Sequence, residues 1–395
     1  MSYDEQLERV LSNQYNDTDF LNLAGNLAGD KLGNLVEDIY SFPSSIAKLN
    51  PVVYRGSKKG TEVIGIYAIK LPKSILKLSA KSRRLIANYL INENSHPDAI
   101  VAFYSEGLDY WRLGFVRSYK YDALESLREF LLGVGQPIKT ALLQLDNPEL
   151  NKKVYNLPAS TELAERQVKL NDAFSIEAVS DKFYDEFKNK HFDAIVTDLK
   201  DSEVAEKDAE DLAVLFFIRI MFLGFVQQKK WLNNDEKYLQ NLLTRYKQQP
   251  KNTGFYKTWL KPLFFEALNG FGKHIAETGL PKEIADEYKM LPYLNGGLYL
   301  KHGVDNSDVN ISDELIEKYF TFLFSYNFTI EENTQTEQSL ELNPELLGII
   351  FERLVNKSNG AVYTPRTEVD FMCRISLVKW LQKNIKNDAP DIKEL

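Results

Sequence analysis

The stretch that decides the fold of the first part of the chain is "VVYRGSKKGTEVIGIYAIKL", from Val52 to Leu71. β-Branched and aromatic residues dominate both of its ends, and the polar "SKKG" between them is typical of a turn. The pattern therefore predicts a β-hairpin. The following stretch, "SAKSRRLIANYLINEN", begins with a serine cap and continues with helical spacing. A hairpin followed by a helix predicts an α/β domain.

Four further stretches extend this domain. "DAIVAFYSEG" (98–107) and "DYWRLGFVRSY" (109–119) predict a second pair of strands. "LNLAGNLAGDKLGNLVEDIYSF" (21–42) and "ALESLREFLLGVG" (123–135) have helical spacing, and Gly133 is expected to end the second helix. We place this α/β N-terminal domain at residues 1–160.

From about Leu157 the pattern becomes helical. "ELAERQVKLNDAFSIEAVSDKFYDEFKNKHFDAI" predicts helix with a break near Asn171 and Asp172. The run "LAVLFFIRIMFLGFV" (212–226) contains Arg219 and is shorter than the ~20 residues of a membrane span, so it predicts a buried helix. We place a mainly α-helical connector domain at residues 161–340.

Three shorter stretches complete the connector domain. "MLPYLNGGLYLKHG" (290–303) is interrupted by proline and glycine and predicts a loop, either structural or a binding turn. "SDELIEKYFTFLFSYNF" predicts a helix capped by Ser312. "TIEENTQTEQSL" (329–340) is polar and is expected to be a surface linker.

Composition excludes several classes of protein. The 395 residues are 44% hydrophobic and 26% charged, as in ordinary globular proteins. The net charge of -8 argues against a surface that binds nucleic acid everywhere, although local basic patches are compatible with it. The single cysteine, Cys373, excludes an internal disulfide and favours a reducing, cytoplasmic location. Because the longest apolar run is too short to span a membrane, no membrane partner is expected. No HExxH or CxxC zinc motif is present.

A nuclease site of the PD-(D/E)xK kind needs an acidic residue on one strand and Glu-x-Lys on the next, so that Mg²⁺ and the lysine meet one phosphate. The element order of the first 120 residues is compatible with such a core. Glu37 is a candidate helix acid, but Glu62 and Lys70 lie on one predicted strand, roughly 26 Å apart. No predicted strand carries Glu-x-Lys. We therefore expect no metal site and no catalytic residue, and Mg²⁺ would enter only with an unrecognised nuclease.

Two short basic patches are candidate DNA contacts. "SAKSRR" contains Arg83 and Arg84, and "FVRSYKY" places Arg117 and Lys120 beside aromatic residues. Such mixtures suit phosphate and base contacts, and a solvated surface is the alternative reading of each. The short "GVG" and "GFG" sequences lack the third glycine of a phosphate loop and predict helix ends.

Six stretches occur in order between about Ala173 and Met372: "DLAVLFFIRIMFLGFVQQKKWL", "GFYKTWLKPLFFEALN", "MLPYLNGGLYL", "FLFSYNFTIEE", "LNPELLGIIFERLVN" and "GAVYTPRTEVDFM". Their succession resembles the region that leads into the methyltransferase core of type IIG (Eco57I-like) restriction–modification proteins and related phage-defence adenine methyltransferases. The resemblance is weaker upstream, at "DYWRLGFVRSYKY" and "EFLLGVGQPIKTA". It implies an N-terminal domain, degenerate or nuclease-like, coupled to an S-adenosylmethionine-dependent adenine methyltransferase core.

The segment "GAVYTP" resembles motif X of amino-methyltransferases, with Val362 in place of its first aromatic residue. The resemblance implies that Tyr363, Thr364 and Pro365 line the pocket for the methionine end of S-adenosylmethionine. A helix that starts after Pro365 would offer free amide groups to a carboxylate. A plain strand-to-helix turn is the alternative.

The chain lacks the other motifs of such an enzyme. An adenine methyltransferase needs a glycine-rich turn and an Asn/Asp-Pro-Pro-aromatic loop that holds the flipped base, and neither occurs here. Residues 341–395 are therefore expected to be the opening segment of a Rossmann-like methyltransferase domain whose body is missing. S-adenosylmethionine is not expected to bind this chain alone.

The expected partners are DNA and the missing methyltransferase and specificity half, or a split partner chain. The alternative is a non-catalytic subunit or adaptor that completes a separate methyltransferase. "RTEVDFMCRISLVKWLQKNIK" (366–386) carries an apolar stripe at helical spacing. We expect this last helix to be a contact in a homo-oligomer or the most mobile helix of the chain.

Overall fold

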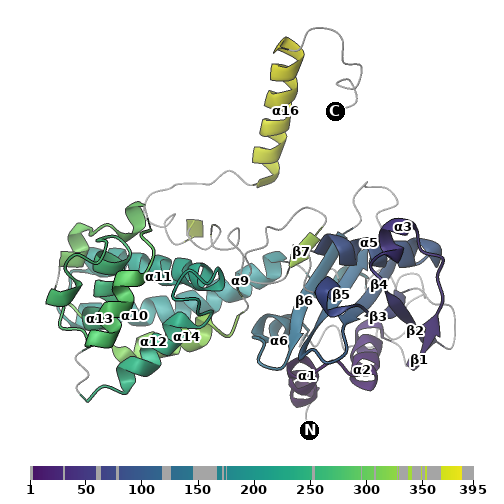
Figure 1. The fold of residues 1–395 in the computed structure, drawn as a ribbon, viewed down its shortest axis with the longest axis horizontal. Coiled ribbons are helices and arrows are strands. Elements are labelled where there is room, and N and C mark those ends of the chain that lie inside the picture. The colour runs from purple at the N-terminus through teal and green to yellow at the C-terminus, as the bar shows by residue number, and fades with distance from the viewer. Residues whose placement is uncertain are drawn as a thin grey trace. The chain divides into compact units, whose positions relative to one another are not determined.

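The computed structural model describes residues 3–29, 32–58, 64–76, 80–117, 126–145, 167–170, 173–174, 176–250, 254–294, 296–306, 308–326, 328, 337–339, 348, 352–353 and 366–384. The chain divides into two units, residues 1–347 and 348–395. The first unit contains both an α/β part and a helical part (Figure 1). The predicted domain boundaries after residues 160 and 340 both lie outside the described ranges and stay predictions. Within those ranges, no helix is long and apolar enough to cross a membrane.

A seven-stranded mixed sheet forms the α/β part, with the strands in the order in which they occur along the chain (Figure 1). They are β1 (Leu32–Asp38), β2 (Val52–Lys58), β3 (Ile64–Lys70), β4 (Asp98–Tyr104), β5 (Tyr110–Arg117), β6 (Ser126–Gly133) and β7 (Glu337–Ser339). Both predicted strand pairs, β2–β3 and β4–β5, are confirmed as antiparallel. Strands β3 and β4 are parallel because the predicted helix α5 (Ala80–Glu93) crosses between them. The carboxyl ends of these two strands therefore lie side by side.

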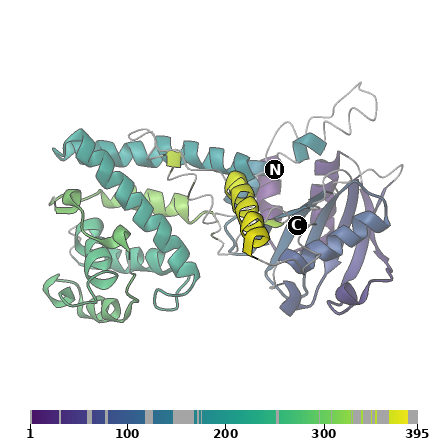
Figure 2. The same ribbon diagram turned by 90° about the horizontal axis from the view of Figure 1, so that it is seen from above.

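The two faces of the sheet bury different side chains because successive residues of a strand point to opposite sides. Ile66, Ala68 and Ile100 belong to the core that also contains residues of α1 (Tyr3–Ser12), α2 (Asp17–Ala28) and α6 (Lys139–Leu145). The opposite core contains Tyr67 and Ile69 with residues of α3 (Ser44–Ala47), α4 (Lys73–Leu76) and α5. Figure 2 shows helices on both sides of the sheet. The middle strands are thus buried on both faces, as is usual for parallel pairs.

The first stretch expected to be helical throughout, residues 21–42, is helical only in its first part. Asn16 caps α2, because its side chain accepts hydrogen bonds from the backbone N–H groups of Thr18 and Asp19. Gly29 ends α2 in the left-handed conformation, with φ of +73°. The chain then forms β1, which pairs with β2. Glu37, expected on a helix, therefore lies on a strand.

The prediction of a helix over residues 123–135 is wrong in the part that the structure describes, because Ser126–Gly133 forms strand β6. The strand is favoured because alternation places Leu127 in one core and Phe130 and Leu132 in the other. Its backbone pairs with β5 on one side and with β7 on the other. Leucine-rich spacing alone does not reveal these partners.

Gly133 ends a strand rather than a helix. Its φ is +126°, a conformation that residues with a side chain rarely adopt. A Cβ atom at this position would lie 2.2 Å from the carbonyl oxygen of Asp109. Glycine is therefore required here by both the backbone conformation and the close approach of β5.

The helical part consists of α- and π-helices and short 3₁₀ turns. They are α9 (Ile176–Glu186), η1 (Phe187–Phe192), α10 (Asp193–Asp201), α11 (Glu206–Gln228), α12 (Tyr238–Lys247), η2 (Tyr256–Leu260), η3 (Leu263–Ala267), η4 (Ile275–Glu277), α13 (Lys282–Met290), η5 (Gly297–Tyr299), η6 (Gly303–Asn306) and α14 (Asp313–Leu323). The buried helix predicted around residues 212–226 is confirmed as α11. Its core is aromatic: Phe217 packs edge-on against Phe187 and Tyr319, at 4.8 and 4.7 Å between ring centroids.

Two expectations for the end of the helical part need correction. Ser312 stands at the start of α14, but its side chain makes no capping hydrogen bond. Its backbone N–H instead donates to Asp198 on α10, at 2.9 Å. Residues 337–339 of the expected surface linker form β7, parallel to β6. A three-residue polar strand carries no hydrophobic pattern that would reveal it.

The second unit contains helix α16 (Arg366–Asn384), as predicted from its spacing. Large apolar side chains on it are exposed, including Phe371 at 63% and Trp380 at 60%. The single cysteine, Cys373, is also exposed on this helix.

Candidate functional site

Polar and aromatic side chains gather where the parallel strands β3 and β4 end. Lys70 and Tyr104 are the last residues of these strands and lie opposite each other in register. The Lys70 ammonium forms an ion pair with Glu106. Tyr15, between α1 and α2, stacks on Tyr104 with 3.9 Å between ring centroids. Carboxyl ends of parallel strands are a common place for ligand sites, so this cluster is a candidate for the predicted nuclease site.

The charges of this cluster hold Lys70 in its protonated form. The hydrogen bond to Glu106 raises the pKa of Lys70. Burial, followed by the charge of Asp17, raises the pKa of both Tyr15 and Tyr104. At neutral pH the cluster therefore presents one ammonium group beside neutral phenols.

The charges of Glu106 and Glu37 both act on Lys70, but β3 carries Ala68 where a Glu-x-Lys motif would place its glutamate. Val52 on β2 lies directly opposite Lys70, and Ala68 lies two residues earlier on the same face of β3. Glu37 is opposite Tyr54 on the neighbouring strand pair and is exposed. Glu62 lies outside the described residues. In the part of the chain that the structure describes, no three His, Cys, Asp or Glu side chains are placed to hold a metal ion.

Arg83, predicted as a DNA contact, is fully buried, and that prediction is wrong. Its Nε donates to both carboxylate oxygens of Glu129, at 3.1 and 3.0 Å. Its Nη1 donates to the carbonyl of Leu76, at 3.2 Å. Arg112 lies 3.3 Å from the same carboxylate. The sequence showed two adjacent arginines, but only the tertiary structure turned one of them into the core.

Of the other predicted DNA contacts, Arg117 lies apart from the cluster at Lys70. Arg84 is half-buried on α5. Arg117 ends β5 and lies 3.7 Å from the buried Asp98 at the beginning of β4, which is the opposite end of the sheet. Asp98 also accepts a 2.6 Å hydrogen bond from Gln167. Lys120 and the predicted cofactor residues Tyr363, Thr364 and Pro365 lie outside the described residues.

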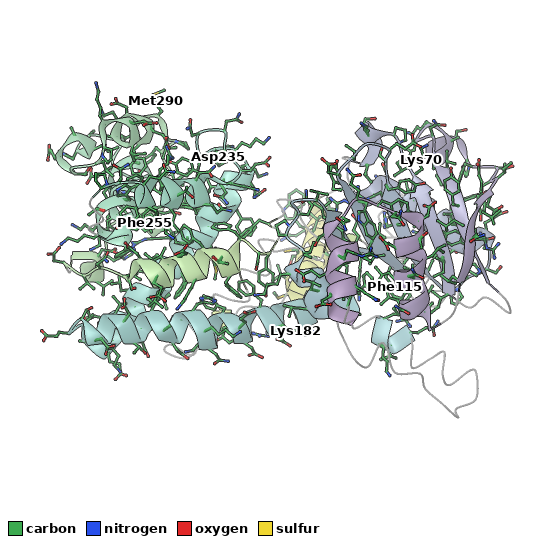
Figure 3. The ribbon with its side chains drawn as sticks, turned by 90° about the horizontal axis from the view of Figure 1, so that it is seen from below. Lys70, Phe115, Lys182, Asp235, Phe255 and Met290 are labelled. Atoms are coloured by element: carbon green, nitrogen blue, oxygen red, sulfur yellow. The ribbon has the colours of Figure 1, made fainter. Side chains whose placement is uncertain are left out.

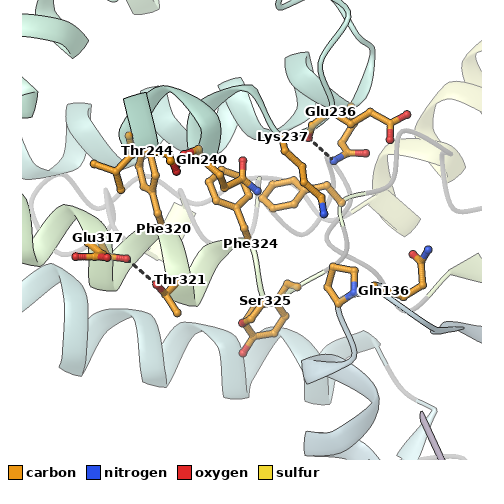
Figure 4. Close-up of a pocket in the computed structure, with 16 residues that line it drawn as sticks. Gln136, Glu236, Lys237, Gln240, Thr244, Glu317, Phe320, Thr321, Phe324 and Ser325 are labelled. Carbon is orange, nitrogen blue, oxygen red and sulfur yellow. Dashed lines mark hydrogen bonds between the residues drawn. The ribbon is translucent and has the colours of Figure 1, made fainter. Parts of the chain in front are cut away.

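A groove of about 820 Å³ lies in the first unit where α12, α14 and the loop after β6 meet (Figure 4). Its lining combines aromatic rings with amide, hydroxyl and charged groups: Gly135, Gln136, Pro137, Gln228, Glu236, Lys237, Gln240, Leu243, Thr244, Glu317, Phe320, Thr321, Phe324, Ser325, Tyr326 and Phe328. Thr321 donates to the carbonyl of Glu317 at 2.9 Å. No motif identified this groove, because its lining comes from three separate segments.

A contact between the α/β and helical parts borders the groove. Lys139 on α6 forms a 2.7 Å ion pair with Glu186 on α9 and lies 4.5 Å from the centre of the Phe322 ring. His191 packs 4.5 Å from the same ring. Burial lowers the pKa of His191 to about 4, so its imidazole is neutral at physiological pH. Figure 3 shows the nearby Lys182 on α9, which donates to the carbonyl of Leu143. Lys139 and Lys182 thus connect the α/β part to the helical part through contacts within the protein.

Comparison with known proteins identifies a relative among restriction–modification proteins. The chain is 32% identical over 198 residues to a protein of Methanocaldococcus jannaschii whose name describes a type II restriction enzyme and methyltransferase. This chain resembles part of a restriction–modification protein. The match covers 46% of the chain and 16% of that relative's length. No family model and no solved structure matches the chain.

Proposed function

We propose that this chain is the N-terminal portion of a type IIG-like restriction–modification protein. In the complete protein, it couples the α/β domain to an S-adenosylmethionine-dependent adenine methyltransferase core. The helical connector braces that core and borders the DNA. The observation that carries the proposal is the ordered set of six stretches ending in "GAVYTP", together with the restriction–modification relative.

In this proposal the cofactor pocket is shared. Tyr363, Thr364 and Pro365 form one wall, and the remaining walls and the amine-binding loop belong to the core. A small ligand usually has most of its surface buried in its site. One wall alone therefore gives no stable complex, and the 395-residue chain is expected neither to bind S-adenosylmethionine measurably nor to methylate DNA.

The α/β domain is proposed to be a degenerate relative of a nuclease rather than an active one. Ala68 stands two residues before Lys70, where a Glu-x-Lys motif would place a metal-binding carboxylate, and Glu106 is taken up by its ion pair with Lys70. What the cluster retains is a lysine paired with Glu106 and several tyrosines, which is not the set of acids that holds the metal that activates water.

The experiment is to express the gene together with the reading frame that follows Leu395 and to map N6-methyladenine in the host DNA. We expect methylation at one recognition sequence, reduced by Tyr363→Ala. Incubation of the 395-residue chain with DNA and labelled S-adenosylmethionine should leave the DNA unlabelled. Absence of methylation by the soluble complete protein would contradict the proposal. An unrelated reading frame after Leu395 would instead favour the alternative, a non-catalytic subunit that completes a separate methyltransferase.

A further inference from the structure

A buried ion pair holds the loop of residues 296–306 from the inside. Arg219 on α11 donates two hydrogen bonds to Asp305, from Nη1 to Oδ1 at 2.7 Å and from Nη2 to Oδ2 at 2.8 Å. Its Nε and Nη2 also donate to the carbonyls of Leu298 and Leu300, at 2.9 and 3.1 Å. Both charged side chains are fully buried. One guanidinium thus fixes three points of the loop.

Further hydrogen bonds close the same network. Asp305 accepts a 2.9 Å hydrogen bond from the backbone N–H of His302. The Tyr299 hydroxyl donates to the carbonyl of Arg219 at 3.0 Å. Burial alone would raise the pKa of Asp305, but the hydrogen bonds from Arg219 and His302 lower it below its ordinary value. The carboxylate is therefore ionised and its charge is matched by Arg219. The loop backbone is preorganised before any ligand arrives.

Three lysines gather on this loop and on the adjoining helical segment. Lys261 donates to the carbonyl of Asp305 at 3.3 Å and lies 5.3 Å from the centre of the Tyr256 ring. Burial lowers the pKa of Lys261, and the charges of Lys301 and Lys257 lower it further, against the opposing charges of Asp305 and Asp308. The charges of Lys257 and Lys301 therefore both act on Lys261, which contacts the loop that carries Lys301.

The acids near these lysines do not cancel their charge. Asp305 is already paired with Arg219 inside the protein. Asp308 forms a 2.7 Å ion pair with Lys257 and is 85% exposed, so water competes for that contact. The patch is thus positive on a chain whose net charge is -8. A bound anion would relieve the repulsion.

We propose that Lys257, Lys261 and Lys301 form a contact surface for the phosphate groups of duplex DNA. The inference rests on the proposed function and adds to it the surface that positions the DNA. Lys257 and Lys261 are four residues apart and lie on the same side of their helical segment. Lys301 is exposed and the Lys257 side chain is 42% exposed, so both ammonium groups are accessible to a polymer. Lysine ammonium groups bind phosphates as point charges, which gives affinity without sequence preference.

The test is the salt dependence of binding between the 395-residue chain and a fluorescently labelled duplex. Each phosphate contact contributes about 0.9 to the slope of log K against log salt concentration. The Lys257→Gln/Lys261→Gln/Lys301→Gln variant is expected to reduce the magnitude of this negative slope by about 2.7. It should also weaken binding at low salt, equally for different sequences. The triple lysine-to-arginine variant should retain binding.

The matched control is Lys229→Gln/Lys230→Gln/Lys237→Gln, which removes the same charge around the α11–α12 turn. It is expected to leave the slope near the wild-type value. Thermal unfolding of all variants checks that each is folded, because Lys261 also contacts the Arg219–Asp305 network through the carbonyl of Asp305.

Four results would overturn the proposed surface. They are wild-type binding by the glutamine variant, an equal loss in the control, no duplex binding by the wild-type chain, and saturation by inorganic phosphate without duplex binding. The last would show a small-anion site instead. Adenine methylation by the complete protein is measured separately, so a protein that methylates DNA but fails this test keeps its proposed function and loses only this surface.

Discussion

At the scale of single residues, the described part of the chain contains two buried arginine–carboxylate systems. Arg83 and Glu129 join α5 to the sheet, with Arg112 beside them. Arg219 and Asp305 join α11 to the loop of residues 296–306. Burying such charges is costly, so each system is stable only because both partners and their hydrogen bonds are in place. Each therefore depends strongly on both members.

Arg219→Met is expected to destabilise the helical part by about 3–5 kcal/mol, because it leaves Asp305 buried without its partner. The double variant Arg219→Met/Asp305→Leu should cost less than the sum of the two single changes, since it removes both charges. Urea unfolding followed by circular dichroism measures this. Lys289→Ala breaks the exposed pair with Asp286 and serves as the control, with an expected change of ~0–1 kcal/mol. A similar loss in the control would contradict the argument.

The Glu129→Gln variant tests the Arg83–Glu129 system through the pH dependence of the free energy of unfolding. Burial alone would raise the pKa of Glu129, but Arg83 and Arg112 hold it below the ordinary value of 4.5. A lowered carboxyl pKa adds stability above the unfolded-state value, and this stability is lost as the pH falls through the folded-state value. The free energy of unfolding of the wild type should therefore exceed that of the variant at pH 7, and the difference should shrink below about pH 4.5. A difference that does not change with pH would show that the carboxylate charge is unimportant.

At the scale of elements, the junction between β5 and β6 depends on one glycine. Gly133→Ala adds a Cβ atom 2.2 Å from the Asp109 carbonyl oxygen at a φ of +126°. We expect a loss of at least ~1–3 kcal/mol, seen as a lower urea midpoint. Gly135→Ala is the matched control, since φ there is +72° and no atom lies within 4 Å of the added Cβ. It should cost only the ~1–2 kcal/mol of a left-handed alanine. Equal losses would show that the close contact does not matter.

Helix α16 exposes several large apolar side chains, and fully burying each one contributes ~1.5–3 kcal/mol. We therefore expect the 395-residue chain to self-associate through this helix. Multi-angle light scattering should show a larger assembly for the full chain than for a version that ends at Thr367. Identical, monomeric masses for both proteins would rule out the helix as an oligomer contact.

At the scale of the whole molecule, the α/β domain is proposed to be a degenerate relative of a nuclease, since Ala68 stands where Glu-x-Lys would place its glutamate. We expect no Mg²⁺-dependent cutting of duplex DNA by the 395-residue chain, because Val52 and Ala68 cannot bind the metal. Supercoiled plasmid incubated with Mg²⁺ or Mn²⁺ should stay intact. Cutting that disappears in Lys70→Ala or Glu62→Ala would show an active site here and would contradict the degenerate reading.

Much of the fold follows from local pattern, because local pattern reflects which faces of an element are buried. The hairpin at Val52–Leu71, the helix after it and the apolar helix around Arg219 could be predicted in this way. The resemblance to restriction–modification proteins also rests on linear motifs, and a relative of that kind supports it. These features depend on residues that are close together in the sequence.

Only the tertiary structure decided the remaining features, because they depend on residues far apart in the sequence. Leu127, Phe130 and Leu132 form a strand although their spacing suits a helix. Their backbone pairs with β5, and their side chains are buried in the two cores on either face of the sheet. Arg83 is buried because Glu129 on β6 lies on the face of the sheet that α5 covers, and nothing in "SAKSRR" reveals that partner. Asp305 pairs with Arg219, 86 positions earlier, and its carbonyl accepts from Lys261, which brings that lysine to the loop that carries Lys301. The sequence determines which residues are charged or hydrophobic. A buried ion pair or a basic patch forms only where folding brings distant segments together.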